Sequence, residues 1–379
     1  MGHHVKTTAA VLRAFGEPQR IEEVELRDPG PGEVLVRIVA AGVCHSDVGQ
    51  ADGEWGYPLP AVLGHEGAGV IDALGPGVKE LAVGQRIVLS LAPGCARCRH
   101  CVVGRPILCQ DALQAMSDGR LTTGSSPIRD AGGPIAAYSL LACFAGHAVV
   151  AARSCIPLPE GVPADVAALV GCAVITGVGS AIETIDVRAG SRGAVIGVGG
   201  VGMNALQGAR LRGAAEIAAL DASEERLERA PRFGATRTID VRDDTLIAAL
   251  RASAPRQGFD WTIVTVGRME AMRLGVDLTR PGGTAAMVGL MPERRPVPID
   301  LLEVVTYEKR IVGSAYGSLD PRILVPRILS LYLEGRLRLD ELVSSRLPLE
   351  AIGEAFELSR RAQGLRTVLA VSNGGAFPA

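Results

Sequence analysis

Gly197-Val198-Gly199-Gly200-Val201-Gly202 follows a short apolar run and opens a segment with helical character. In a G-x-G-x-x-G run the first glycine permits a tight turn, the second lets backbone approach a pyrophosphate, and the third lets helix and strand pack closely. An acidic residue, Asp221, closes the next apolar run, where a carboxylate can bind both ribose hydroxyls of an adenosine. Its charge would repel a 2′-phosphate, so NAD is favoured over NADP. The alternative is a glycine turn that packs an ordinary βαβ unit, against which the position of Asp221 argues.

The pattern of expected strands and helices changes shortly before this turn. The first 160 or so residues contain short β-like runs separated by Gly and Pro, which predict a compact β-rich domain. From about Ser191, strand-like runs alternate with helix-like ones, at residues 194–196, 201–211 and 217–221 and from Ser223 on. Such alternation predicts a parallel, doubly wound sheet, so the fold class is α/β.

Four cysteines in fifteen residues form a C-x2-C-x2-C-x7-C run: Cys95, Cys98, Cys101 and Cys109. Four thiolates can close tetrahedrally on one Zn²⁺ with no position left open, which is typical of a structural zinc site. A disulfide framework is one alternative, but residues 1–20 have no signal-peptide pattern, so reduced thiols in the cytoplasm are expected. An iron–sulfur cluster is another, but the ferredoxin run ends in C-x3-C-P.

Two further cysteines and a histidine, Cys44, His65 and Cys172, have the chemistry of a catalytic zinc whose fourth position is left to water or substrate. Taken singly, each is as readily explained as a packed core thiol or a satisfied histidine. Cys172 lies in the longest apolar stretch, residues 166–182, which is short for a bilayer span and predicts an interior helix. An open zinc site and a closed zinc site in the same chain indicate an enzyme.

Composition narrows the possible partners. The 379 residues are enough for two domains with sizeable cores, and a hydrophobic content of 47% alongside 47 Gly and 23 Pro indicates a globular, turn-rich chain. The net charge of -2 argues against a nucleic-acid or anionic-membrane partner. A small-molecule substrate is therefore expected.

Residues 8–371 resemble the zinc-dependent medium-chain alcohol dehydrogenases. The resemblance rests on the cysteine run and the glycine turn already described, and on three short segments: Gly42-Val43-Cys44-His45-Ser46-Asp47, Gly64-His65-Glu66 and Gly171-Cys172. It implies a GroES-like β-rich catalytic domain made of residues 1–173 and 317–379, with a zinc lobe at about 92–112. A Rossmann NAD-binding domain, residues 174–316, would be inserted between them.

The resemblance also implies roles for single residues. Ser46 would take the proton of the alcohol, with Asp47 and Glu66 as carboxylates behind the zinc ligands. Coenzyme contacts would be made at the pyrophosphate by His45 and Arg366, at the nicotinamide by Thr176 and at the adenosine ribose by Arg226. An apolar substrate pocket would include Trp55, Leu91, Phe144 and Tyr316, although each of these side chains is equally explained as core.

Three positions depart from the family pattern. Gly49 stands where members with a histidine or tyrosine proton relay carry that side chain, so the relay is expected to end in water, in His45 or in the coenzyme ribose. Pro231 interrupts a segment that is one helix in the family, which predicts a kink or an early stop. Leu113 stands where the glutathione-dependent formaldehyde branch has an arginine.

The function expected from these observations is that of an alcohol dehydrogenase or aldehyde reductase, which transfers hydride between a primary alcohol and NAD with two zinc ions per chain. Aromatic and allylic alcohols are among the candidate substrates. One alternative is a nicotinoprotein whose tightly bound NAD passes hydride to an external acceptor. An alternative of another class is a non-catalytic zinc-binding scaffold or regulatory protein, against which the joint presence of Cys44, Ser46, His65 and Cys172 argues. The resemblance implies a homodimer, with a homotetramer as the alternative.

Overall fold

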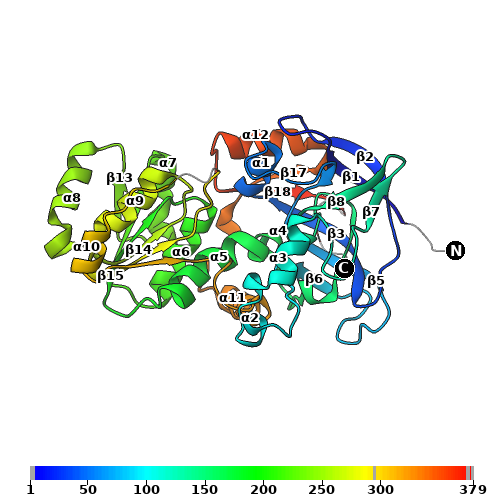
Figure 1. The fold of residues 1–379 in the computed structure, drawn as a ribbon, viewed down its shortest axis with the longest axis horizontal. Helices are drawn as coiled ribbons and strands as arrows, with labels where there is room; N and C mark the ends of the chain where they lie inside the picture. Colours follow the sequence, from blue (N-terminus) through cyan, green and yellow to red (C-terminus); the bar gives the residue numbers. More distant parts are fainter. Residues whose placement is uncertain (1–4, 293–295, 373–375, 377–379) are drawn as a thin grey trace. The chain divides into compact units, whose positions relative to one another are not determined.

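The computed structural model describes residues 5–292, 296–372 and 376 of the chain. The chain divides into two compact units (Figure 1). The first comprises Met1–Cys172, Asp320–Gly335 and Leu339–Ala379, and the second comprises Ala173–Leu319 and Arg336–Arg338. Both ends of the chain therefore build the first unit, and its middle builds the second.

The first unit is rich in β-structure. Five strands close a barrel in the order β1-β2-β7-β8-β4: β1 (Val5–Leu12), β2 (Arg20–Leu26), β4 (Ala61–Val62), β7 (Ile128–Asp130) and β8 (Gly133–Ala137). A seven-stranded sheet has the order β10-β6-β5-β3-β18-β17, with β9 on β3: β3 (Glu33–Val43), β5 (Glu66–Leu74), β6 (Arg86–Leu89), β9 (His147–Ala151), β10 (Cys155–Pro157), β17 (Val343–Pro348) and β18 (Arg366–Ala370). Strand β3 is buried along almost its whole length, as expected of a central strand.

The register of three neighbouring strands decides where the chemistry of this unit gathers. Gly42 at the end of β3 pairs with Glu66 at the start of β5, and Val43 pairs with Thr367 near the start of β18. Three segments that lie far apart in sequence therefore meet at one end of the sheet: residues 43–44, 65–66 and 366.

Short helices connect these strands. The first unit carries α1 (His45–Ala51), α2 (Arg99–Val102), α3 (Gln110–Ser117), α4 (Ala164–Leu169), α11 (Pro321–Leu333) and α12 (Ile352–Arg360), with 3₁₀ turns at Pro106–Leu108, Tyr138–Leu140, Ala152–Ser154, Asp340–Leu342 and Leu349–Ala351.

The interior helix predicted over residues 166–182 is confirmed, and it is not regular. Helix α4 continues through a π-helical segment, Val170–Val174, into α5 (Ile175–Gly179) and a second π-helical segment, Ser180–Thr184. By length and composition alone Ala164–Thr184 could cross a membrane, but 78% of the apolar window is buried inside the protein, as in a core helix. Cys172 lies on the first π-helical segment, a kind of irregularity that is frequent at functional sites.

The second unit has a six-stranded parallel sheet in the order β13-β12-β11-β14-β15-β16. Its strands are β11 (Arg192–Ile196), β12 (Glu216–Asp221), β13 (Arg237–Asp240), β14 (Phe259–Val264), β15 (Thr279–Met287) and β16 (Arg310–Gly313), and its helices besides α5 are α6 (Gly200–Leu211), α7 (Glu224–Arg229), α8 (Asp244–Gln257), α9 (Met269–Leu278) and α10 (Leu301–Thr306). The strand order reverses between β11 and β14, where ligands of doubly wound sheets bind. The predicted α/β fold class is confirmed.

Pro231 has the predicted effect on local structure. The α-helix ends at Arg229, a 3₁₀ turn follows over Ala230–Phe233, and Gly234 ends it with φ of 113°. Proline cannot donate the backbone hydrogen bond that a continuing α-helix requires, so the tighter turn replaces the expected helix.

Candidate metal and coenzyme sites

One carboxylate holds two of the predicted zinc ligands in place. Cys44 caps the start of α1, and its amide donates to Oδ2 of Asp47 at 3.0 Å. Oδ1 of Asp47 accepts from the Gly64 amide at 3.2 Å and from Nδ1 of His65 at 2.9 Å. Because Asp47 is fully buried, this network ties the start of α1 to the start of β5.

The hydrogen bond from His65 to Asp47 decides which nitrogen is free. A carboxylate only accepts, so Nδ1 carries a proton, and in the neutral imidazole that binds a metal the lone pair is on Nε2. The hydroxyl of Ser46 lies 3.4 Å from Nε2 and donates to Sγ of Cys44 at 3.2 Å. Burial lowers the pKa of His65, but the charge and hydrogen bond of Asp47 outweigh it and raise that pKa well above its ordinary value.

The two thiols of this cluster are unequal without metal. A hydrogen bond from Cys172 holds the pKa of Cys44 well below its ordinary value, and the same bond raises that of Cys172, which burial raises further. Since metal binds thiolates, its uptake here would release a proton.

Glu66 and Arg366 face each other behind the ligands. Oε1 of Glu66 lies 3.8 Å from Nη2 of Arg366, and both side chains are buried. Neither oxygen of Glu66 has a hydrogen-bond partner among the described residues. Burial raises the pKa of Glu66 to about 7, although the charge of Arg366 lowers it.

The cluster fits a zinc ion. The ligand atoms of Cys44, His65, Glu66 and Cys172 all lie within 4.8 Å of one another. Two thiolates and an imidazole are donors that Zn²⁺ prefers in catalytic sites, and the carboxylate of Glu66, which faces Arg366 without a hydrogen bond, lies beside them. The structure thus assembles the three predicted ligands around one point.

The four-cysteine run also converges on one point. All eight cysteines of the chain are free thiols, and the sulfurs of Cys95, Cys98, Cys101 and Cys109 lie within 4.8 Å of one another. Four sulfurs bound to one Zn²⁺ lie about 3.8 Å apart in a tetrahedron with bonds of about 2.3 Å. The amide of Cys98 donates to Sγ of Cys95 at 3.3 Å, and bonds from the amides of Arg97 and Cys98 lower the pKa of Cys95 to about 7.

Cys98→Ser should destabilise this lobe while sparing the chemistry of the catalytic cluster. A structural zinc in small zinc domains contributes roughly 10–16 kcal/mol of apparent folding free energy, and losing one thiolate removes much of it. We expect one zinc fewer per chain and a lower melting temperature, measured by metal analysis and calorimetry. A variant that keeps both its metal content and its melting temperature would contradict the closed site.

The glycine turn of the second unit has the geometry that the sequence predicts. Gly197 ends the run from β11 with φ of +85°, a conformation that other residues rarely adopt. A side chain at Gly202 would collide with the carbonyl of Gly197, so helix α6 can pack this closely only with glycine there. At Gly199 the nearest atom that a methyl group would meet is Nη1 of Arg226 at 3.7 Å. That open backbone beside a guanidinium fits a pyrophosphate.

Asp221 is fixed at the end of β12. Its Oδ2 accepts from the Val198 amide at 2.7 Å and its Oδ1 from the Ser223 amide at 2.9 Å, which ties it to the glycine turn. Sequence reasoning missed Thr265, which follows β14 and donates to the carbonyl of Gly197 at 2.5 Å. A polar residue directly after the fourth strand of a doubly wound sheet was the available signal.

The remaining coenzyme residues are placed in different units. His45 is exposed on α1 of the first unit. Arg366 is buried there, and its Nη1 donates to the carbonyl of Val43 at 3.4 Å. Thr176 lies on α5 of the second unit. Their contacts with a coenzyme stay predictions.

The four residues predicted for the substrate pocket differ in their burial. Its ring is fully buried in the main core of the first unit and packs edge-on against Phe356, with 6.0 Å between centroids. Leu91 is partly buried and packs against the same core, whereas Trp55 is exposed. Tyr316 is buried and belongs to the second unit. The roles of these four side chains in binding a substrate stay predictions.

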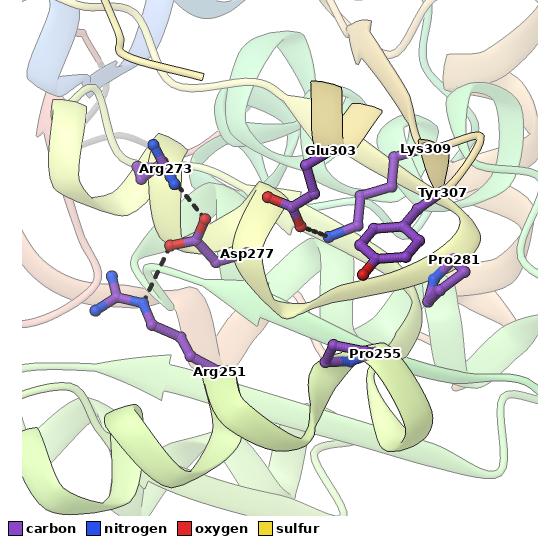
Figure 2. A pocket seen from close by; sticks show the side chains of 8 residues that line it. All are labelled: Arg251, Pro255, Arg273, Asp277, Pro281, Glu303, Tyr307 and Lys309. Carbon is purple, nitrogen blue, oxygen red and sulfur yellow. Dashed lines mark hydrogen bonds and ion pairs between the residues drawn. The ribbon is translucent and has the colours of Figure 1, made fainter. Parts of the chain in front are cut away.

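A separate hollow of about 260 Å³ in the second unit contains none of these residues. The charged side chains that line it form ion pairs with one another (Figure 2). Asp277 pairs with Nε of Arg273 at 2.6 Å and with Nε of Arg251 at 3.1 Å, while Nζ of Lys309 pairs with Glu303 at 2.6 Å and donates to the carbonyl of Val276 at 3.0 Å. Lys309 thus binds a carbonyl in the last turn of α9 that also accepts from the Thr279 amide, so these charged groups already have partners within the unit.

Comparison with known proteins gives one consistent result. Residues 30–160 match the family model for the alcohol dehydrogenase GroES-like domain, and residues 200–331 match that for zinc-binding dehydrogenases. An NDMA-dependent alcohol dehydrogenase from Amycolatopsis methanolica is 37% identical over 368 residues, 96% of this chain and 99% of that protein. The putative alcohol dehydrogenase D of Mycobacterium tuberculosis is 36% identical over 370 residues, 96% of this chain and 100% of that protein.

Solved structures agree with this result. Benzyl alcohol dehydrogenase from Acinetobacter calcoaceticus superposes with a TM-score of 0.91 at 31% identity, covering 97% of this chain and 100% of that one. An alcohol dehydrogenase zinc-binding domain protein from Burkholderia ambifaria has a TM-score of 0.91 at 34% identity over 100% of both chains. With this identity along nearly its whole length, the chain belongs to the zinc-dependent medium-chain alcohol dehydrogenase family.

Proposed function

We propose that this alcohol dehydrogenase transfers hydride between a primary aromatic or allylic alcohol and NAD, with one catalytic and one structural zinc per chain. The observation that carries the proposal is the convergence of Cys44, His65 and Cys172 within 4.8 Å of one another, in a chain that also carries the glycine turn. When bound, zinc would acidify the alcohol hydroxyl and NAD would accept the hydride.

The side chains around the cluster have distinct tasks. Asp47 holds the imidazole of His65 in the tautomer that binds metal, through a 2.9 Å hydrogen bond. Ser46 has a hydroxyl at 3.4 Å from Nε2 of His65, where it can take the proton that an alcohol loses. Burial of Asp47, His65 and Glu66 excludes water from the ligand network. In the second unit, Asp221 would bind the adenosine ribose.

The substrate class rests on similarity. One of the similar solved structures is named a benzyl alcohol dehydrogenase, which supports an aromatic primary alcohol. The decisive assay is a panel of aromatic, allylic and aliphatic alcohols and aldehydes with NAD and NADP, followed by the absorbance of the reduced nicotinamide. Absence of alcohol-dependent nicotinamide reduction by zinc-replete protein would overturn the proposal. If turnover were also absent with an external hydride acceptor, a non-catalytic zinc-binding scaffold would be favoured.

A nicotinoprotein is the second candidate, because a similar protein is named for its dependence on NDMA. In that case NAD would stay bound and pass hydride to an external acceptor. Denaturing the purified protein and assaying the released coenzyme separates the two candidates. Stoichiometric release from protein that was never given NAD would support the nicotinoprotein.

Coenzyme choice should depend on Asp221. We expect a strong NAD preference, and Asp221→Gly should relax it, because the variant no longer repels a 2′-phosphate. The measurement is kcat/KM with each coenzyme for both proteins. Arg226 acts in the opposite direction, because its guanidinium lies close enough to the glycine turn to attract a 2′-phosphate. Equal efficiency with NAD and NADP in the unmutated protein would therefore contradict the role of Asp221.

We also propose a homodimer, with a homotetramer as the alternative, in a reducing compartment such as the cytoplasm, because both zinc sites need free thiols. Strand β16 ends its sheet and pairs with β15 alone among the described strands. Helix α10 exposes Leu301, Leu302 and Val305, each more than 70% accessible. Exposed apolar surface of this kind often marks a protein interface.

The dimer proposal predicts that Leu302→Glu combined with Val305→Glu lowers the mass in solution to that of one chain. Burying two carboxylates in an apolar contact without partners is costly, so the interface should open. Light scattering after gel filtration measures the mass. Val83→Glu, at another exposed apolar residue, is the control, and an unchanged mass in the double variant would exclude α10 from the interface.

A further inference from the structure

Alcohol oxidation by NAD releases one proton for each hydride transferred, and the proton must leave a buried ligand network. This inference rests on the proposed function. The first group to accept the proton is the hydroxyl of Ser46, which is half-buried on α1. Residues three apart on a helix share a face, so the next position on that face is Gly49, which has no side chain to carry the proton outward.

The chain turns back over Gly49 directly after α1. Gly53, with φ of 85°, donates to the carbonyl of Gln50 at 3.1 Å, and the amide of Glu54 donates to the carbonyl of Gly49 at 2.9 Å. A methyl group built on Gly49 would lie 2.9 Å from Cδ of Glu54 and closer still to its Oε2. The carboxylate of Glu54 and the ring edge of Trp55, also at 2.9 Å, therefore occupy the space that a side chain at position 49 would fill.

Glu54 differs from the neighbouring charged groups in having no fixed partner. Asp47 is bound to His65, Asp52 pairs with Arg360 at 2.6 Å, and Arg360 also pairs with Glu357 at 2.7 Å. Within residues 5–292 and 296–372, the side chain of Glu54 has no hydrogen bond or ion pair, and it is exposed to solvent. It is therefore free to exchange protons with bulk water.

We propose that Glu54 is the outer member of the proton path from Ser46. Ser46 accepts the proton of the alcohol and gives up its own hydroxyl proton to a bridging water, which passes one proton to Oε2 of Glu54. The carboxylate becomes a carboxylic acid and then loses that proton to solvent, so the path is restored after each turnover. Cβ positions three residues apart on a helix lie about 5–6 Å apart, and Oε2 of Glu54 lies against the Cβ position of residue 49. A water can bridge a gap of that size from Ser46.

The test is Glu54→Gln in zinc-replete protein, with alcohol oxidation followed in single turnovers in weak buffer. A pH-indicator dye reports proton release, and absorbance reports the reduced nicotinamide. A group acting at the reacting atoms contributes about a hundred- to ten-thousand-fold, so we expect a smaller loss, about tenfold, for a residue acting through water. Rising concentrations of a buffer that does not coordinate zinc, such as a sulfonate buffer, should restore the rate of the variant and leave the parent unchanged. The zinc content of the variant should stay the same.

Two further variants separate a relay from a structural role. Asp52→Asn removes an adjacent carboxylate that is already paired, and it should show no buffer dependence. Gly49→Ala keeps the carboxylate of Glu54, but the new methyl group displaces that carboxylate from the helix. This variant should show the same buffer dependence as Glu54→Gln.

The outcomes are distinct. Parental rates and no buffer dependence in Glu54→Gln, or equal effects in Asp52→Asn, would overturn the relay while leaving the proposed function intact. A parent protein that oxidises no alcohol would overturn the proposed function and the relay with it.

Discussion

Cys172→Ser should lower kcat for alcohol oxidation on the order of a thousandfold or more, since stabilisation by a bound metal is worth several kcal/mol. The sulfur of Cys172 is one of two thiolates in the cluster, and all ligand atoms there lie within 4.8 Å of one another. A serine hydroxyl stays protonated near neutral pH and is a poor zinc ligand, so the catalytic zinc should be lost or misplaced. Steady-state kinetics and metal analysis measure the two effects.

The fold should survive Cys172→Ser. The zinc of the cysteine lobe is held by other ligands, so metal analysis should find one zinc per chain instead of two. Cys155→Ser is the matched control, because Cys155 is a buried thiol on β10 outside both clusters and its replacement should leave kcat largely unchanged. Full turnover by Cys172→Ser would remove Cys172 from the catalytic site.

Ser46→Ala should lower alcohol oxidation by about a hundred- to ten-thousand-fold, the usual contribution of a general acid–base group. Its hydroxyl is 3.2 Å from Sγ of Cys44 and 3.4 Å from Nε2 of His65, close to where a bound alcohol would lose its proton. Zinc content and NAD binding should persist, because Ser46 is not needed as a ligand. Single-turnover rates measured across a range of pH test the effect on the chemical step.

Ser46→Thr is the control for this prediction. It keeps a hydroxyl at the same place on α1 and should retain much of the activity. If Ser46→Ala turned over at the parental rate with chemistry limiting, the proton would have to leave by another route, and His45, exposed on the same helix, would be the next residue to replace.

Local features of this protein could be predicted from the sequence because they depend on short stretches of backbone. The glycine turn requires φ of +85° at Gly197 and close packing at Gly202, and only the spacing within six residues decides both. The cysteine run brings its sulfurs together within fifteen residues. Pro231 marks the change from α-helix to 3₁₀ turn, because its missing amide hydrogen is a property of the residue itself.

Contacts between distant segments were decided only by the tertiary structure. The pairing of β3 with β5 and β18 sets Cys44, Glu66 and Arg366 side by side, and that register depends on the whole sheet. The packing of the Phe144 ring edge-on against Phe356 likewise joins residues far apart in the sequence. Glu54 lies over Gly49 only because the chain reverses after α1. Spacing and residue type describe the chain locally, but which side chains meet depends on the burial and strand pairing of the complete fold.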